Sequence, residues 1–264
     1  MPDRYAVIGH PVAHSKSPWI HAQFARGTGE ALEYGMIDAP AEGFVREVER
    51  FRAAGGKGLN VTLPFKYEAY RLCIRHGERS RRAQAVNTIR FADSFGDNTD
   101  GIGLVRDITQ NLRYDLNRRS ILLLGAGGAA QGVLGALLEA GTARLAVANR
   151  TESKAKTLAA RFPGVLACGY DALAGERFDV VINATSAGLT GASPALPRGL
   201  LGDSVLAYDM VYGRDTPFLA AARKAGARAH DGLGMLVEQA AESFFVWRGV
   251  RPATHPVLAK LRVS

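Results

Sequence analysis

Short apolar runs alternate along the chain with stretches whose apolar positions recur at helical spacing. Residues 121–124 (I-L-L-L) form a wholly apolar run, which is typical of a strand buried on both faces of a parallel sheet. Similar runs predict strands at residues 5–8, 33–38, 58–62, 85–89, 144–148, 180–183 and 205–209. Helices are predicted at about residues 18–26, 42–54, 102–111, 131–140, 152–162, 217–225, 235–247 and 252–261.

This alternation predicts an α/β fold with parallel sheets and βαβ crossovers. A chain of 264 residues can hold two modest domains that each bury a core. Since the most distinctive strand begins only near residue 120, we expect a separate α/β domain to precede the unit that it starts. A ligand cleft is then expected between the two domains.

A glycine-rich turn follows the apolar strand at residues 121–124. Its pattern is G-x-G-x-x-A, made by Gly125, Ala126, Gly127, Gly128, Ala129 and Ala130. In dinucleotide-binding loops the first glycine permits the tight turn, the second lets the backbone approach a pyrophosphate, and the third position needs a small residue. The amides at the start of the next helix then face the phosphates. Taken alone, such a motif is equally compatible with an ordinary tight turn.

The end of the next predicted strand carries a basic residue in place of the usual acid. NAD-dependent enzymes place a carboxylate there to hold the ribose hydroxyls. This chain has Asn149, Arg150 and Thr151 at that position, with Lys154 one helical turn on. An arginine suits a 2′-phosphate, so the sequence favours NADP over NAD. The competing interpretation is an arginine at a solvated strand end.

Two stretches in the first part of the chain join a proline to polar side chains at a helix start. In S-K-S-P at residues 15–18, Ser17 is a natural N-cap before Pro18, and the serines could equally hold a carboxylate at the open helix amides. Pro64 places Lys66 in the first turn of a helix, where the helix dipole disfavours the charged ammonium and so assists proton donation.

Other polar residues are ambiguous when taken singly. Asn87, Thr99 and Asp100 lie near predicted strand and turn ends, where α/β proteins bind ligands, but each is also a common turn former. Gln239 lies on a predicted helix, where a lone glutamine usually faces solvent.

Composition narrows the function classes. The net charge of +8 suits anionic small ligands or nucleic acid, but the basic residues are dispersed and no nucleic-acid-binding motif is present. The two cysteines and the six histidines are scattered, so we expect reduced thiols and no metal site. With no signal peptide and no run long enough to span a bilayer, we expect a cytoplasmic protein.

Together, motifs along nearly the whole chain resemble the shikimate dehydrogenase family. They are S-K-S-P at 15–18, N-V-T-L-P-F-K at 60–66, A-V-N-T at 85–88, D-N-T-D-G at 97–101, G-A-G-G-A-A at 125–130, N-R-T at 149–151, N-A-T-S at 183–186 and D-G-L-G-M-L-V-E-Q-A at 231–240. The set of motifs in this order is far more specific for the family than any single motif. It implies NADPH-linked reduction of 3-dehydroshikimate to shikimate in aromatic amino acid (chorismate) biosynthesis.

The resemblance also implies domain boundaries and residue roles. Residues 1–101, completed by C-terminal helices at 236–264, would form the substrate domain, and residues 102–235 the Rossmann-type NADP domain. Lys66 would be the general acid/base, paired with Asp100. The implied substrate contacts are Ser15, Ser17, Asn60, Thr62, Lys66, Asn87, Asp100, Tyr212 and Gln239. The implied NADP contacts are Glu78, residues 125–130, Asn149, Arg150, Thr151, Lys154, Thr185, Ser186, Met210 and Gly232.

Two alternatives have distinct signatures. The quinate/shikimate dehydrogenase branch uses NAD or either cofactor, and Arg150 with its neighbours argues against it. A non-catalytic dinucleotide sensor would have lost the chemistry, and the presence of both Lys66 and Asp100 argues against that. We expect no nucleic-acid or membrane partner, and the sequence leaves open whether the protein is a monomer or a homodimer.

Overall fold

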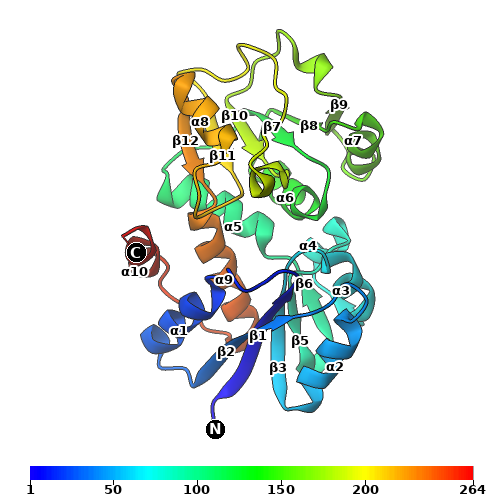
Figure 1. Cartoon of the computed structure of the whole chain (residues 1–264), viewed down its shortest axis with the longest axis vertical. Helices are drawn as coiled ribbons and strands as arrows, with labels where there is room; N and C mark the ends of the chain where they lie inside the picture. Colours follow the sequence, from blue (N-terminus) through cyan, green and yellow to red (C-terminus); the bar gives the residue numbers. More distant parts are fainter. Residues whose placement is uncertain (264) are drawn as a thin grey trace. The chain divides into compact units, whose positions relative to one another are not determined.

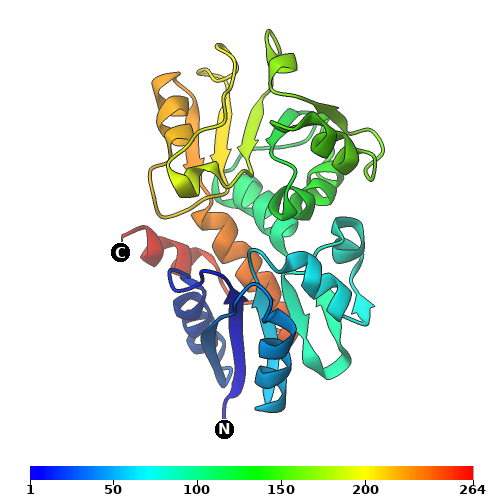
Figure 2. The same cartoon turned by 45° about the vertical axis from the view of Figure 1, so that its right-hand side comes forward.

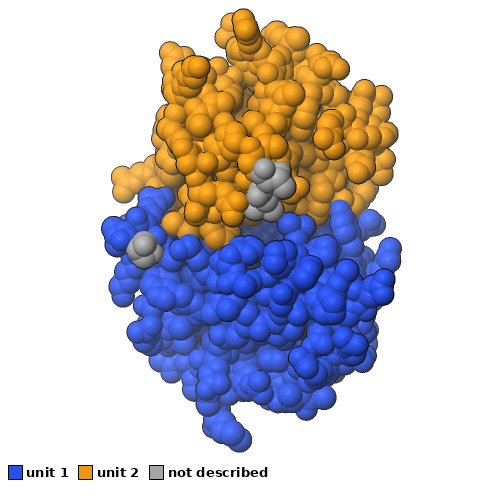
Figure 3. All heavy atoms as spheres, viewed as in Figure 1, with its two compact units in different colours: residues 1–103, 236–264 blue, residues 104–235 orange. Residues whose placement is uncertain are grey.

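A computed structural model describes residues 1–263, leaving out the side chains of residues 189 and 190. The chain forms two compact units (Figure 3). Unit 1 comprises Met1–Gly103 and Leu236–Ser264, and unit 2 comprises Leu104–Met235. The α/β fold predicted from the sequence is confirmed. The assignment of substrate binding to one unit and of cofactor binding to the other stays a prediction.

Unit 1 is built on a six-stranded sheet of order β2-β1-β3-β5-β6-β4 (Figure 1). Its strands are β1 (Asp3–Gly9), β2 (Leu32–Asp38), β3 (Gly56–Val61), β4 (Arg75–His76), β5 (Thr88–Arg90) and β6 (Phe95–Asp97). Its helices are α1 (Ser17–Thr28), α2 (Phe44–Ala53), α3 (Lys66–Leu72), α4 (Glu78–Ala83) and α10 (His255–Arg262), while α5 (Asp100–Arg106) and α9 (Leu233–Arg248) continue into unit 2.

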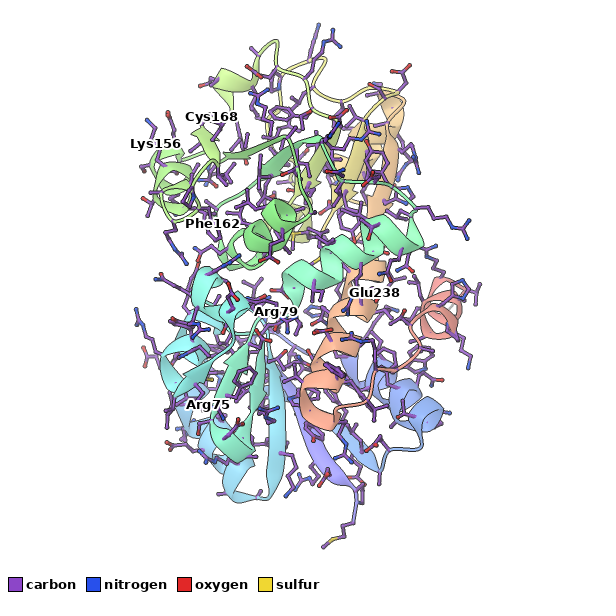
Figure 4. All side chains as sticks on the ribbon, turned by 180° about the vertical axis from the view of Figure 1, so that it is seen from behind. Arg75, Arg79, Lys156, Phe162, Cys168 and Glu238 are labelled. Atoms are coloured by element: carbon purple, nitrogen blue, oxygen red, sulfur yellow. The ribbon has the colours of Figure 1, made fainter. Side chains whose placement is uncertain are left out.

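Side chains that alternate along the strands give this sheet two covered faces. Ala6 and Ile8 of β1 pack with Phe44 of α2 and Phe65 before α3. On the opposite face, Tyr5 stacks on Trp247 of α9 at 4.6 Å between ring centroids. Figure 4 shows α9 from this second side. Both faces are therefore buried, which explains the apolar runs at β1 and β3.

The expectation of purely parallel sheets is wrong for unit 1. Strand β5 runs antiparallel to both β3 and β6. The physical reason is a tight reversal at the 3-10 turn Phe91–Asp93, closed by Ser94 at φ 48°. The strand predicted at 85–89 begins only at Thr88, because the Val86 backbone N–H donates to the Lys66 carbonyl of α3 and not to a neighbouring strand.

Unit 2 has a fully parallel sheet of order β12-β11-β10-β7-β8-β9. The strands are β7 (Ser120–Leu124), β8 (Arg144–Ala148), β9 (Leu166–Cys168), β10 (Val180–Asn183), β11 (Leu206–Asp209) and β12 (Arg228–Asp231). Helices α6 (Gly128–Glu139) and α7 (Glu152–Ala159) pack on one face (Figure 2), and α8 (Pro217–Lys224) packs on the other. A π-helical segment (Asp107–Asn111) continues α5, and short 3-10 turns span Asp171–Leu173 and Ala187–Thr190.

This strand order puts a topological switch point between β7 and β10. From β7 the chain continues to β8 at one side of the sheet, and from β10 it continues to β11 at the other side. Ligands of open α/β sheets bind at that point, beyond the carboxyl ends of the strands. Strands β9 and β12 were missed by the sequence analysis because they are short and only partly buried. No helix among the described residues is long and apolar enough to cross a membrane.

His21 of α1 is fully buried against aromatic rings, stacked on Tyr34 at 4.1 Å. Neither ring nitrogen has a hydrogen-bond partner of normal geometry. Burial lowers the pKa of His21 from 6.5 to about 3, and the Asn60 side chain opposes this shift only partly. The folded protein therefore holds His21 neutral, whereas the unfolded chain takes up a proton below its ordinary pKa.

We therefore expect folding stability to fall with acidification between the unfolded and folded pKa values of His21. Its contribution is fully present above pH 6.5 and is lost at about 1.4 kcal/mol per pH unit as pH falls toward 3. Urea unfolding between pH 7 and 4.5 should show a shallower pH dependence for His21→Phe than for the unsubstituted protein. Equal slopes would contradict this assignment.

Candidate active site

Lys66 and Asp100 form an ion pair in unit 1, with 2.5 Å between Lys66 Nζ and Asp100 Oδ2. Lys66 is the first residue of α3, immediately after the turn at Pro64, and Asp100 is the first residue of α5, just beyond β6. Their side chains are only 14% and 8% exposed. A pair so shielded from water interacts more strongly than a surface pair and keeps a fixed geometry.

The second oxygen of Asp100 is held by Asn87. Asn87 Nδ2 lies 2.9 Å from Asp100 Oδ1, and Asn87 Oδ1 accepts the backbone N–H of Thr99 at 2.8 Å. The carboxylate thus accepts hydrogen bonds from an ammonium and from an amide. Both donors stabilise its charged form.

Gln239 of α9 completes this cluster. Its Oε1 lies 3.3 Å from both Asn87 Nδ2 and Thr99 Oγ1, while its Nε2 donates to the Leu236 carbonyl at 2.9 Å. A side chain on the Gly103 backbone would meet Gln239 Cβ at 2.7 Å, so glycine allows this close approach of α5 to α9. The structure therefore brings together predicted residues that are far apart in sequence: Lys66, Asn87, Asp100 and Gln239.

The predicted carboxylate-binding serines lie at the start of α1. Ser17 was expected to cap this helix, but the helix begins at Ser17 itself, Lys16 is the N-cap, and Ser17 N–H donates to Ser15 Oγ at 3.3 Å. The helix begins one residue earlier than predicted because the Ile20 backbone N–H already donates to the Lys16 carbonyl at 3.1 Å. None of the described hydrogen bonds connects either serine to Lys66 or Asp100.

Two further predicted substrate contacts come from β3 and its end. Asn60 is buried and bonded to its neighbours in unit 1. Thr62 donates its backbone N–H to the Ile8 carbonyl at 2.9 Å, and its methyl group packs on Gly9. Tyr212, another predicted contact, belongs to unit 2.

The glycine-rich turn of unit 2 has the backbone that a dinucleotide loop requires. Gly125 has φ 105°, in the region that favours glycine, and an added Cβ would meet the Ala184 backbone at 3.2 Å. A Cβ on Gly127 would meet nothing within 4 Å, so the backbone is open to an incoming group. Gly128 and Ala129 begin α6, and Ala130 is fully buried in the core, as the third position requires. Ala126 is partly buried beside them. These residues fit a bound pyrophosphate.

The end of β8 carries polar and basic residues where NAD-dependent enzymes have a carboxylate. Arg150, Thr151 and Lys154 are exposed, and Asn149 donates to the Thr151 carbonyl at 2.9 Å. The nearest acid in sequence, Glu152, pairs with Lys156 at 2.8 Å. A cavity of about 260 Å³ opens beside Ala126, lined by polar and basic side chains that include Gln131, Ser153, Lys154, Thr157 and Arg161. This corner suits a 2′-phosphate better than a ribose hydroxyl.

The remaining predicted cofactor contacts lie at the carboxyl ends of β10 and β11 and after β12. Thr185 Oγ1 donates to Asn183 Oδ1 at 2.7 Å, and Ser186 follows it before the 3-10 turn. An added Cβ on Gly232 would lie 2.5 Å from the Met210 carbonyl oxygen, so only glycine fits there. Glu78, by contrast, belongs to unit 1, where it pairs with Arg82 at the start of α4.

The sequence analysis overlooked hydroxyl residues beside the ion pair. Thr88 Oγ1 donates to Asn87 Oδ1 at 2.9 Å, and Ser243 Oγ lies 2.7 Å from Thr88 Oγ1. Thr88 stands inside the A-V-N-T motif and Ser243 lies one helical turn after Gln239. Their positions next to predicted site residues were the available signal.

Comparisons with known proteins agree along the whole chain. Three family profiles match: "Shikimate dehydrogenase substrate binding domain" over residues 7–89, "Shikimate / quinate 5-dehydrogenase" over 106–191 and "Shikimate 5'-dehydrogenase C-terminal domain" over 232–262. The chain is 59% identical to the shikimate dehydrogenase (NADP(+)) of Methylobacillus flagellatus, over 99% of this chain and 100% of that protein.

Solved structures give the same picture. An Ael1 enzyme from Pseudomonas putida superposes with a TM-score of 0.92 at 49% identity, over 98% of both chains. Shikimate 5-dehydrogenase from Thermus thermophilus, in complex with NADP(H) and shikimate, superposes with a TM-score of 0.88 at 36% identity, again over 98% of both chains.

Proposed function

The chain belongs to the shikimate dehydrogenase family, and we propose that it catalyses the NADP(H)-dependent interconversion of 3-dehydroshikimate and shikimate. The observation that supports this most directly is the buried Lys66–Asp100 pair, held by Asn87 beside Gln239. Such a pair supplies a proton donor with a fixed orientation, which the reduction of a ketone requires.

In the direction of reduction, the Lys66 ammonium donates a proton to the carbonyl oxygen as negative charge develops on it. In the reverse direction, the neutral Lys66 amine removes the proton of the substrate hydroxyl. Asp100 stabilises the ammonium and fixes its direction through their 2.5 Å contact. Asn87 and Gln239 are proposed to contact the hydroxyl groups of the ring, and Ser15, Ser17 and Thr62 the substrate carboxylate and its surroundings.

NADP(H), when bound, supplies or accepts the hydride. We propose that the amides of residues 125–130 hold its pyrophosphate and that Asn149, Arg150, Thr151 and Lys154 hold the 2′-phosphate. Thr185, Ser186, Met210 and Gly232 are proposed to line the nicotinamide end, with Tyr212 as a further substrate contact. Glu78 is the least supported cofactor contact, because its carboxylate is engaged by Arg82.

The test of the proposed function is a spectrophotometric assay of the purified protein at 340 nm with shikimate, with NADP and NAD in parallel. We expect robust reduction of NADP and little of NAD. Comparable activity with quinate or with NAD would favour the quinate/shikimate dehydrogenase alternative. Absence of turnover with NADP still bound would favour a non-catalytic binding protein. We also propose a cytoplasmic location, consistent with Cys73 and Cys168 both being free, and a monomeric or homodimeric state.

Replacing Arg150 by glutamine is expected to raise the KM for NADP by about tenfold or more, because a charge-assisted contact to the 2′-phosphate is lost. The KM for NAD, which has no such phosphate, should change less than about twofold. Lys156→Gln is the matched control. Lys156 on α7 (labelled in Figure 4) is exposed like Arg150, but it pairs with Glu152. Equal effects of Arg150→Gln on both cofactors would contradict the role of Arg150.

A further inference from the structure

A set of buried and partly buried hydrogen-bonding side chains lies next to Asn87 in unit 1. It consists of Tyr34 on β2, Asn60 on β3, Thr88 on β5 and Ser243 on α9, and we refer to it as the Asn60 network. Thr88 and Ser243 are 0% exposed and Asn60 is 6% exposed. Polar side chains this deeply buried are costly unless each finds a partner, so their arrangement is informative.

The orientation of the Asn87 amide follows from a single contact. The backbone N–H of Thr99 can only donate, so the Asn87 atom 2.8 Å away must be the oxygen. The Asn87 nitrogen therefore faces Asp100 Oδ1 at 2.9 Å. A flipped amide would turn its oxygen toward the carboxylate and replace an attraction by a repulsion.

The orientation of Asn60 is fixed in the same way. The Asn87 carbonyl can only accept, so the Asn60 atom 3.1 Å from it is the nitrogen. The Asn60 nitrogen also lies 2.9 Å from Ser243 Oγ, and Asn60 Oδ1 accepts from the Tyr34 hydroxyl at 2.7 Å. The Asn60 amide protons are thus used by the Asn87 carbonyl and by Ser243, although sequence resemblance implied a substrate contact for Asn60.

Asn60 Oδ1 accepts from Tyr34, and Asn60 Nδ2 donates to Ser243 Oγ. The Ser243 hydroxyl donates to the Gln239 carbonyl at 3.0 Å and lies 2.7 Å from Thr88 Oγ1. Thr88 Oγ1 donates to Asn87 Oδ1, and Asn87 Nδ2 donates to Asp100 Oδ1. Linked hydrogen bonds of this kind are mutually polarising and resist the reversal of any member. This chain of hydrogen bonds ends at the carboxylate that holds Lys66.

We infer that Thr88, supported by Asn60 and Ser243, is a positioning residue that holds the Asn87 amide in the orientation donating to Asp100. This inference rests on the proposed function, in which Asp100 orients Lys66. It assigns Asn60 to the support of the ion pair and leaves the direct substrate contacts to other side chains. Thr88 itself touches none of the reacting atoms.

The test compares Thr88→Val with Thr88→Ser. Valine keeps the shape of threonine but removes the hydroxyl, whereas serine keeps the hydroxyl. We expect Thr88→Val to lower kcat for shikimate oxidation about tenfold with less than about a threefold change in KM, since the loss falls on the chemical step. Thr88→Ser should retain kcat within about threefold of the unsubstituted protein. A folded Thr88→Val with unchanged kcat, or a Thr88→Ser as impaired as Thr88→Val, would overturn the inference.

Two further variants separate positioning from stability. Ser243→Ala breaks the chain one step earlier and should lower kcat in the same direction, which keeps the test valid if Thr88→Val does not fold. Ser80→Ala is the control: Ser80 is equally buried in unit 1, but its hydroxyl donates to the Gly77 and Gly96 carbonyls, away from Asn87. Ser80→Ala should lower the thermal unfolding temperature without changing kcat. Loss of kcat in Ser80→Ala equal to that in Ser243→Ala would count against positioning.

A readout without turnover distinguishes failure of the inference from failure of the proposed function. In protein labelled with ¹⁵N-asparagine, the side-chain amide signals of Asn87, assigned with Asn87→Asp, should shift and exchange faster with solvent in Thr88→Val than in Thr88→Ser. Unchanged Asn87 signals would overturn the inference even in an active enzyme. Absence of turnover by the unsubstituted protein would instead reject the proposed function alone.

Discussion

Replacing Lys66 by alanine is expected to lower kcat by about 10²- to 10⁴-fold, the range typical for loss of a general acid/base. The KM for shikimate should change much less, because the ammonium mainly stabilises charge that develops during the reaction. The measurement is initial-rate kinetics at 340 nm with saturating NADP. Retention of near-normal turnover would contradict the proposed role of Lys66.

Lys57→Ala provides the matched control for Lys66→Ala. Lys57 lies on β3 of the same unit but is exposed. Its replacement should leave kcat and KM unchanged. Lys66→Ala also leaves Asp100 buried without its cation, which costs stability, so thermal unfolding of both variants must accompany the kinetics. If a variant unfolds well above the assay temperature, its loss of kcat reflects the chemical step and not a loss of folded protein.

The pattern of apolar positions was sufficient to predict most helices and strands of the fold. The strands β8 and β10 begin and end at the predicted residues, because their apolar runs are bounded by clear polar positions. A strand was predicted near β5, but its antiparallel direction could not be anticipated, because the reversal at Phe91–Asp93 contains neither glycine nor proline. Ser94 adopts the left-handed conformation there without a residue type that announces it.

The candidate site was predictable only in part, for a different physical reason. Local patterns placed Lys66 at a helix start, and the structure agrees. They could not show that Gln239 approaches Asn87, because the approach depends on α9 packing on the sheet of unit 1. The Asn60 network has the same origin, since Ser243 reaches Asn60 across 183 positions of sequence. Resemblance supplied residue identities, and packing determined which side chains support one another.

Replacing Asp100 by asparagine is expected to lower kcat by about 10²-fold or more, which is the second largest effect. Asparagine has nearly the shape of aspartate but no charge, so the Lys66 ammonium loses its counter-ion. Asp100 also accepts from two donors, Lys66 at one oxygen and Asn87 at the other. The amide introduced by Asp100→Asn has one oxygen and one NH₂ group, so one of these contacts becomes donor against donor whichever way it turns.

The same kinetics test Asp100→Asn, with Asp93→Asn as the matched control. Asp93 also lies in unit 1 and binds Arg75 and Arg90, but it is farther from the chemistry and more exposed, so its replacement should leave kcat unchanged. If Asp100 mainly orients Lys66, the double variant Lys66→Ala with Asp100→Asn should be little slower than Lys66→Ala alone, because residues that act as a unit are not additive. Independent, multiplying losses would show that Asp100 contributes by a route other than Lys66, such as direct contact with the substrate.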